Sequence, residues 1–203
     1  GLPLKGSIVI VSFFVAGVLT GMAGIWTSSG PWDDYTRYAL YLLMFLVGAS
    51  LGAGGKIREM FRSLGIKTLL VPIATITGTL AFSALAALMI SRYSVYDCMA
   101  VGSGFGYYSL SSVFITQYKG AELGTVALMT NIFREIITLL FAPLLVRFFS
   151  PLAPICAGGA TTMDTTLGVI TRFSGREYVF IAVFHGAVVD FTVPFFVTFF
   201  CGL

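Results

Sequence analysis

The chain has 203 residues, of which 57% are hydrophobic and only 10% are charged, and its mean hydropathy is +0.94. Soluble domains carry about 25% charged residues, so this composition excludes a soluble globular protein and predicts an integral membrane protein. The net charge of +3 comes without a run of basic residues, which argues against a nucleic-acid partner. The three cysteines form no CxxC pair. We therefore expect packing residues rather than metal ligands or a disulfide framework, and we predict no cofactor.

Five segments are long and apolar enough to cross about 30 Å of hydrocarbon. Two shorter segments, near 97–118 and 153–173, are apolar but are interrupted by glycine-rich stretches. The sequence therefore predicts an all-α polytopic membrane protein with one transmembrane domain over residues 1–203. The five predicted spans lie near residues 6–26, 37–55, 67–91, 123–147 and 178–201.

The basic residues predict the orientation of these segments, because cytoplasmic loops are enriched in Lys and Arg. The loop between the second and third spans holds four basic residues, so we expect it in the cytoplasm. If the segments near 97–118 and 153–173 both cross the membrane, Arg147 lies outside. If both are re-entrant hairpins, Arg147 lies inside with the other basic residues that follow it. The re-entrant alternative keeps one more Arg in the cytoplasm. It predicts hairpins that enter from opposite sides and a periplasmic C-terminus.

The first glycine-rich interruption begins at Ser103 and ends at Ser111. Glycine weakens helices, and a hydroxyl in hydrocarbon needs a hydrogen-bond partner. Irregular backbone at membrane depth is tolerated only where it is buried in protein or lines a watery cavity. We therefore predict that this polar tip contributes to a substrate or ion site through Ser103, Gly104, Gly106, Ser109 and Ser111.

Two adjacent charged residues, Arg134 and Glu135, lie in the middle of the 123–147 span. A charge at the bilayer centre costs about 2.5–3.5 kcal/mol on insertion scales, so such a residue usually faces a cavity or a partner. Asn131 and Thr138 share one helix face with Arg134. Adjacent residues point about 100° apart on a helix, so Arg134 and Glu135 cannot simply pair with each other. We predict that Glu135 takes part in transport, with Asn131 and Arg134 beside it. The alternative is a structural network that packs helices, and for Arg134 that reading stays open.

The second interruption surrounds Asp164 with four threonines, Thr161, Thr162, Thr165 and Thr166, and follows Gly159. Hydroxyls beside a carboxylate suit a cation or an ammonium group, because each oxygen can accept a hydrogen bond. The alternative is an Asp that caps a broken half-helix. We predict that Gly159, Thr161, Thr162 and Asp164 contribute to the site.

The last span carries His185 and Asp190, which are five residues apart and point to different faces of the helix. We consider Asp190 as a proton site, with packing against a polar neighbour as the alternative, and we expect His185 to be hydrogen-bonded structure. The G-x-S-x-G nucleophile motif is absent, and the glycine-rich stretch is not a phosphate-binding loop. We therefore predict that the chain is not an enzyme.

Opposed broken helices of this kind are typical of inverted-topology transporters, which aim helix ends at the substrate. The motifs resemble those of the bacterial lysine exporter family (LysO type) over nearly the whole chain. The resemblance rests on Ser103–Ser111, Asn131 with Arg134-Glu135, Gly159–Asp164 and His185-Gly186. It implies export of L-lysine, and of lysine analogues, across the bacterial inner membrane, coupled to a proton or another cation. It also implies that Glu135 lies in the translocation path.

The sequence departs from the pattern of this family in two ways. Family members are commonly longer at the N-terminus, so either the chain is truncated or a small membrane partner supplies the further spans. A homo-oligomer is the other assembly that we consider. Relatives often have proline where this chain has Gly168. Lysine carries two ammonium groups, which Glu135 and Asp164 could meet. Its carboxylate could meet either a half-helix N-terminus or Arg134. The alternative functions are an ion-coupled carrier of another small cationic or neutral metabolite, or a membrane subunit of a two-chain transporter.

Overall fold

The computed structural model describes residues 66–203 throughout and a scattered set before them. The chain divides into two compact units, Gly1–Val47 and Gly48–Leu203. The predicted spans near 6–26 and 37–55 fall largely outside the described residues. The described positions from 12 to 22 and from 38 to 49 are helical. The earlier described positions are 12, 15–17, 19–24, 35, 38, 42, 45 and 49.

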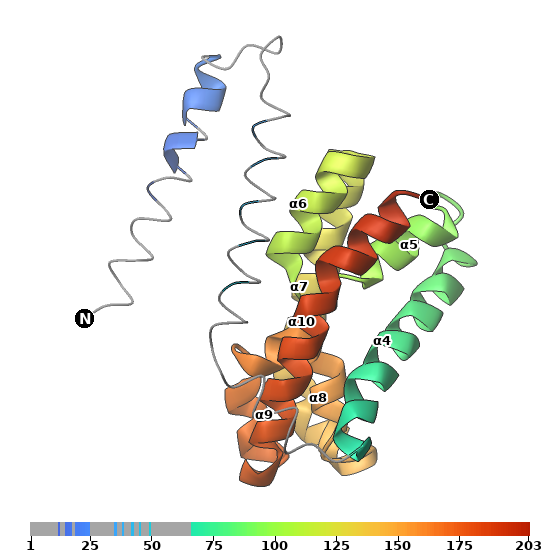
Figure 1. The fold of residues 1–203 in the computed structure, drawn as a ribbon, viewed down its shortest axis with the longest axis vertical. Coiled ribbons are helices and arrows are strands. Elements are labelled where there is room, and N and C mark those ends of the chain that lie inside the picture. Colours follow the sequence, from blue (N-terminus) through green and yellow to red (C-terminus); the bar gives the residue numbers. More distant parts are fainter. Residues whose placement is uncertain are drawn as a thin grey trace. The chain divides into compact units, whose positions relative to one another are not determined.

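Three helices of the described part are long and apolar enough to cross a membrane. They are α4 (Ile66–Ala87), α7 (Ala121–Phe148) and α10 (Val179–Cys201), shown in Figure 1. Their 22, 28 and 23 residues correspond to about 33, 42 and 34 Å at 1.5 Å per residue. Long apolar helices therefore lie over the predicted spans near 67–91, 123–147 and 178–201, although α4 ends a turn earlier than expected.

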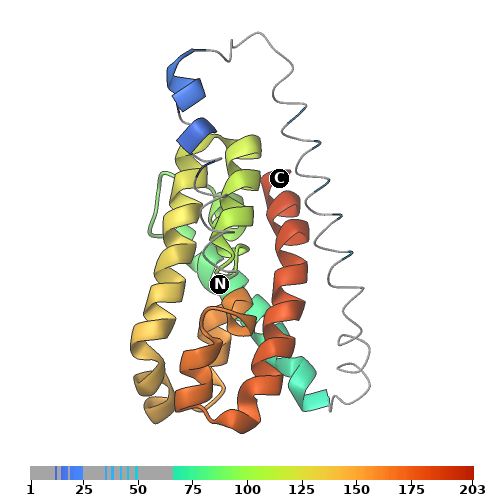
Figure 2. The ribbon, with the colours of Figure 1, turned by 90° about the vertical axis from the view of Figure 1, so that its left-hand side faces the viewer.

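The two glycine-rich segments form short helices that are separated by irregular turns. With at most 12 residues, or about 18 Å, none of these helices can span the hydrocarbon alone. In Figure 2 the first pair lies beside one end of α7, and the second group lies beside its other end. The elements are α5 (Val95–Gly102), α6 (Tyr108–Lys119), α8 (Ala153–Gly158), the 3-10 helix η1 (Gly159–Met163), α9 (Leu167–Phe173) and the 3-10 helix η2 (Arg176–Tyr178).

Polar contacts close the base of the first pair of short helices. Ser94 caps α5 in a capping box with Asp97, which satisfies two otherwise unpaired backbone donors. Lys119 at the end of α6 pairs with Asp97 at 3.4 Å. In the loop before α5, a hydrogen bond from the Tyr93 hydroxyl to Glu122 (2.9 Å) raises the pKa of that phenol. These links hold the start of α5 near the end of α6 and the start of α7.

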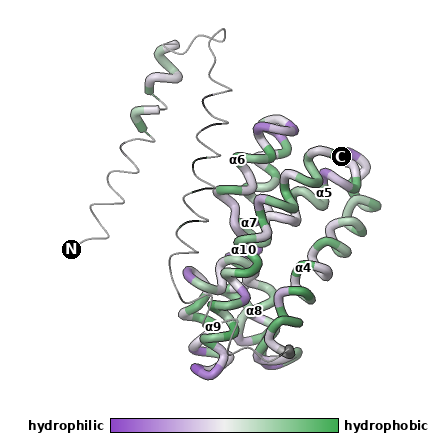
Figure 3. Tube along the Cα trace, in the orientation of Figure 1, coloured by the Kyte–Doolittle hydropathy of each residue, from purple (hydrophilic) through white to green (hydrophobic). Residues whose placement is uncertain are grey.

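The outer surface of the long helices is apolar. Figure 3 shows hydrophobic residues along α4 and α10 and hydrophilic residues at the ends of the bundle. Large side chains such as Phe82, Leu140 and Phe199 are 75%, 67% and 60% exposed, which is the pattern of a lipid-facing surface. Inside, Val71, Ile155, Ile170 and Ala182 form a buried core that joins α4, α8, α9 and α10. This core fixes the second group of short helices between the long ones.

Candidate functional site

The two glycine-rich interruptions meet inside the bundle. We call the turn between α5 and α6 the first tip, and the end of α8 with η1 the second tip. The backbone N–H of Ala160, in η1, donates to the carbonyl oxygen of Phe105, in the turn between α5 and α6, at 2.9 Å. Gly106 and Gly159 have φ of 94° and 62°. A Cβ on Gly106 would lie 3.0 Å from the Gly158 oxygen, and one on Gly159 would collide with the Phe105 carbonyl. Glycine is therefore required here both by the backbone conformation and by the close approach of the two tips.

Asn131 of α7 holds the first tip in place. Its side chain is 2% exposed, and its Oδ1 accepts a hydrogen bond from the Gly106 N–H at 2.8 Å. Its Nδ2 donates to the carbonyl oxygens of Val101 (3.2 Å) and Ala127 (2.9 Å). Every hydrogen-bonding group of this buried amide thus has a protein partner except one lone pair. Asn131 replaces the helical hydrogen bonds that α5 and α6 lose at the turn.

Arg134, one turn further along α7, binds the second tip. Its Nε donates to Ala157 O at 2.8 Å and its Nη2 to Cys156 O at 3.0 Å, so the guanidinium caps the C-terminal end of α8. Cationic groups are favourable at that end of a helix. Its Nη1 donates to Thr79 Oγ1 of α4 at 3.2 Å. Three of five N–H donors are therefore used, and no carboxylate of the described residues pairs with this cation.

A groove of about 770 Å³ runs between α4 and α7, and Arg134 lies in its wall. Sequence reasoning missed the α4 side of this groove. The missed signal is the spacing Thr75, Thr79, Ser83, which places three hydroxyls on one face of an apolar helix. The polar lining consists of Thr75, Thr79, Ser83, Thr130, Arg134 and Thr138, and the apolar lining includes Phe82, Phe133 and Ile137.

Glu135 lies on the neighbouring face of α7. It is partly buried, does not line the groove between α4 and α7, and forms no hydrogen bond or ion pair with any residue that the structure describes. The predicted separation of Arg134 from Glu135 is thus present, because Arg134 turns to backbone carbonyls of α8. The two carboxyl oxygens of Glu135 thus have no hydrogen-bond partner among the described residues, in the middle of a membrane-length helix.

His185 of α10 ties the second tip to α4. It is fully buried, with Nε2 at 2.8 Å from Thr75 Oγ1 and Nδ1 at 3.1 Å from Thr162 Oγ1. The Thr162 hydroxyl also lies 2.8 Å from the Ala182 and Gly159 oxygens, to which it can only donate. It therefore accepts from Nδ1–H, and the Thr75 hydroxyl also donates to the carbonyl oxygen of Val71 at 3.1 Å. This histidine is hydrogen-bonded structure, as the sequence led us to expect.

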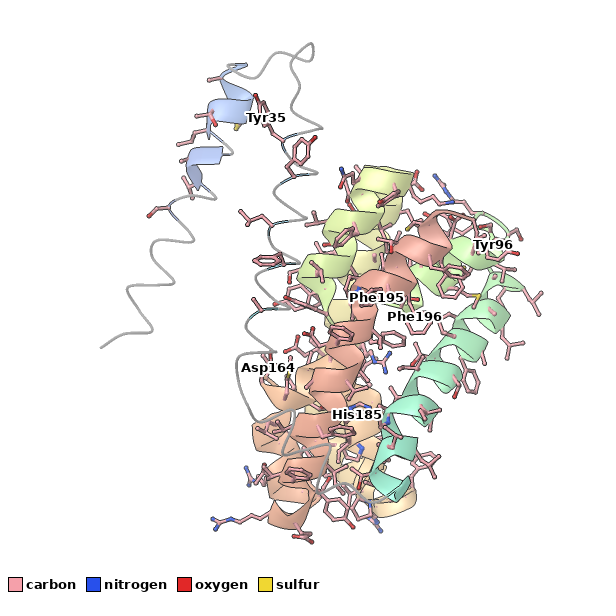
Figure 4. All side chains as sticks on the ribbon, viewed as in Figure 1. Tyr35, Tyr96, Asp164, His185, Phe195 and Phe196 are labelled. Carbon is pink, nitrogen blue, oxygen red and sulfur yellow. The ribbon has the colours of Figure 1, made fainter. Side chains whose placement is uncertain are left out.

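The two remaining predicted acids are Asp164, which follows η1, and Asp190, which lies on α10. Figure 4 shows Asp164 and His185 on opposite sides of α10 in that view. Asp164 is exposed, and its Oδ1 accepts from the backbone N–H of Thr165 at 2.5 Å. The N-cap of α9 is Thr166, so Asp164 does not cap that half-helix. Asp190, on α10, is 7% exposed.

The hydroxyl groups of the predicted tips mostly bind nearby backbone. Ser103 and Ser111 are buried and donate to Met99 O (2.6 Å) and Tyr107 O (2.8 Å), and Thr161 donates to Gly158 O at 2.9 Å. Ser109 is exposed. The structure thus brings one set of the predicted residues together at the tip contact and leaves Glu135, Ser109, Asp164 and Asp190 around it. That set is Ser103, Gly104, Gly106, Ser111, Asn131, Arg134, Gly159, Thr161 and Thr162.

A family model described as "Lysine exporter LysO" matches residues 11–201. The chain belongs to the lysine exporter LysO family. It is 30% identical over 194 residues to the Escherichia coli protein "Lysine exporter LysO", covering 95% of this chain and 62% of that relative. It is 32% identical over 164 residues to a Haemophilus influenzae protein named "Putative lysine exporter", covering 80% of this chain and 82% of that relative.

The chain therefore spans 62% of the length of its E. coli relative. No solved structure matches it. The LysO family is described as one of exporters rather than enzymes, which agrees with the prediction that the chain is not an enzyme. Membership in this family and the long apolar helices together make the chain an all-α bacterial membrane protein.

Proposed function

We propose that this LysO-family chain is the core of a secondary active transporter that exports L-lysine from the bacterial cytoplasm across the inner membrane. The observation that carries the proposal is the contact between the two broken-helix tips, Ala160 N–H to Phe105 O, beside Asn131 and Arg134 of α7. Transporters build substrate sites where discontinuous helices meet inside the membrane. The names of the two relatives supply the substrate.

Two neighbouring side chains of α7 match the charges of an amino acid. Glu135 has acceptor oxygens that bind no side chain of the described residues and can accept from an ammonium group of lysine, and a charge held at this depth is usually retained for function. Arg134 keeps two N–H donors beyond its three protein hydrogen bonds. It also lines a groove of about 770 Å³, so we assign the lysine carboxylate to Arg134 rather than to a half-helix N-terminus.

The proposal includes a membrane topology for these segments. Both groups of short helices are re-entrant, with α5 and α6 entering from the periplasm and the group from α8 to α9 entering from the cytoplasm. The C-terminus of α10 is then periplasmic. Single cysteines at Lys119 and Ser150 test this arrangement in intact cells, because an impermeant reagent should label the first and not the second. Labelling of the second from outside would contradict it. Completion of the site by a small membrane partner or a second copy stays a prediction.

The role of Glu135 is tested by export in cells that lack their own lysine exporter and are challenged with a lysine-containing dipeptide. Cells with the parent protein, and with whatever partner it needs, should resist the dipeptide. Cells with Glu135→Gln should lose resistance, because the amide keeps the shape of the side chain but not its charge. Glu177→Gln is the matched control, since Glu177 lies in η2 at the end of the bundle. Resistance with Glu135→Gln equal to that of the parent would show that the carboxylate is not needed.

A further inference from the structure

The hydroxyl group of Thr79 has a hydrogen-bond donor that no described residue uses. Its Oγ1 accepts from Arg134 Nη1 at 3.2 Å, and the Thr79 side chain forms no other hydrogen bond with the described residues. Thr75 and Thr77, on the same helix, donate to backbone carbonyl oxygens one turn earlier at 3.1 and 2.8 Å, as threonines in helices commonly do. Thr79 therefore accepts from the guanidinium and still has its own proton to donate.

Arg134 also has donors left for a ligand. A guanidinium carries one N–H on Nε and two on each Nη. Nε donates to Ala157 O, one N–H of Nη2 to Cys156 O, and one N–H of Nη1 to Thr79. One donor therefore remains on each Nη, and both Arg134 and Thr79 line the groove between α4 and α7. No acidic residue is among the described residues that line this groove, so they supply no counter-ion to Arg134.

Contacts one turn before and one turn after Thr79 hold this part of α4 against the rest of the bundle. Before it, Thr75 Oγ1 lies 2.8 Å from Nε2 of the buried His185 of α10. After it, Ser83 packs against the end of α5, where a Cβ on Gly102 would collide with the Ser83 side chain. Thr79 lies between these two contacts, so its hydroxyl is held in position before a ligand binds. Less conformational freedom is then lost on binding.

We propose that Thr79 is a substrate-binding residue whose hydroxyl donates to the lysine carboxylate beside Arg134. A carboxylate has two oxygens that each accept more than one hydrogen bond, so it can take the remaining donors of Arg134 and the Thr79 proton together. These two residues form the carboxylate subsite of the groove. Its apolar wall, which includes Phe82, Phe133 and Ile137, suits an aliphatic chain. The inference rests on the proposed function for lysine as the ligand, whereas the subsite itself recognises a carboxylate on an aliphatic chain.

Competition binding to the purified protein tests the subsite, with lysine, ε-aminocaproate and cadaverine as the ligands. The first two carry a carboxylate, and cadaverine lacks one. Thr79→Val keeps the shape of the side chain without its hydroxyl, so it should weaken the first two ligands about 3- to 10-fold, as expected for one lost hydrogen bond, and leave cadaverine unchanged. Thr79→Ser should bind like the parent. Thr77→Val is the matched control, because Thr77 is exposed on α4, lies outside the groove and donates to Ile73 O.

Equal weakening of cadaverine by Thr79→Val, or unchanged binding of all three ligands, would overturn the subsite. Thr79→Ala also removes the hydroxyl and gives the same comparison if Thr79→Val does not fold. Lysine export from proteoliposomes separates the subsite from the proposed function. If Thr79→Val shows the selective loss but the parent exports no lysine under any ion gradient, the export function fails and the subsite stands. If the parent exports lysine and Thr79→Val weakens all three ligands equally, the subsite fails and the export function stands.

Discussion

Replacing Gly159 with alanine should destabilise the fold by about 1.5–4.5 kcal/mol. Gly159 has φ 62° and ψ −127°, a conformation that is open to glycine and costs other residues about 1–3 kcal/mol. A Cβ there would also collide with the carbonyl oxygen of Phe105. Relieving the collision must lengthen the hydrogen bond from Ala160 to Phe105, and a hydrogen bond contributes about 0.5–1.5 kcal/mol net. The two costs together give the expected loss.

The assay is reversible unfolding of the purified protein in mixed micelles, followed by far-UV circular dichroism. Gly168→Ala is the matched control, because no atom lies within 4 Å of an ideal Cβ on Gly168 and its φ is not positive. Within α9, alanine is favoured over glycine by about 0.5–1 kcal/mol, so this variant should be as stable as the parent or slightly more stable. If Gly159→Ala unfolds at the same denaturant fraction as Gly168→Ala, the tips are not in the contact described above.

Two further predictions concern α7. Asn131→Leu leaves the buried Gly106 N–H without its acceptor, and an unsatisfied buried group costs about 1–3 kcal/mol. The same unfolding assay should show that loss, and a neutral result would mean that the turn finds another acceptor. Arg134→Gln should remove the preference for lysine over cadaverine, which lacks the carboxylate. Charge-assisted hydrogen bonds contribute about 1.5–3 kcal/mol, so competition binding should show lysine weakened about 10- to 100-fold. Equal weakening of both ligands would point to a structural role, and Arg147→Gln, at the end of the same helix, is the control.

The sequence by itself determined the class of protein and the places where its helices break. Apolar segments of this length must be buried in lipid or in the core of a membrane protein, so composition and hydropathy predicted an all-α membrane protein. The bounds of α7 and α10 agree with the predicted spans within two residues. The glycine-rich interruptions also stood out, because glycine and hydroxyl residues conflict with a continuous span. The motifs in them, with Arg134-Glu135, sufficed to indicate the family.

Only the tertiary structure decided which groups meet. Arg134 binds the carbonyl oxygens of Cys156 and Ala157, and Phe105 accepts from Ala160. Every residue has a carbonyl group, so no residue type marks these partners in the sequence. The residue types along the chain determine local properties such as hydropathy and helix breaks. Contacts between residues that are distant in the sequence depend on how the helices pack against one another.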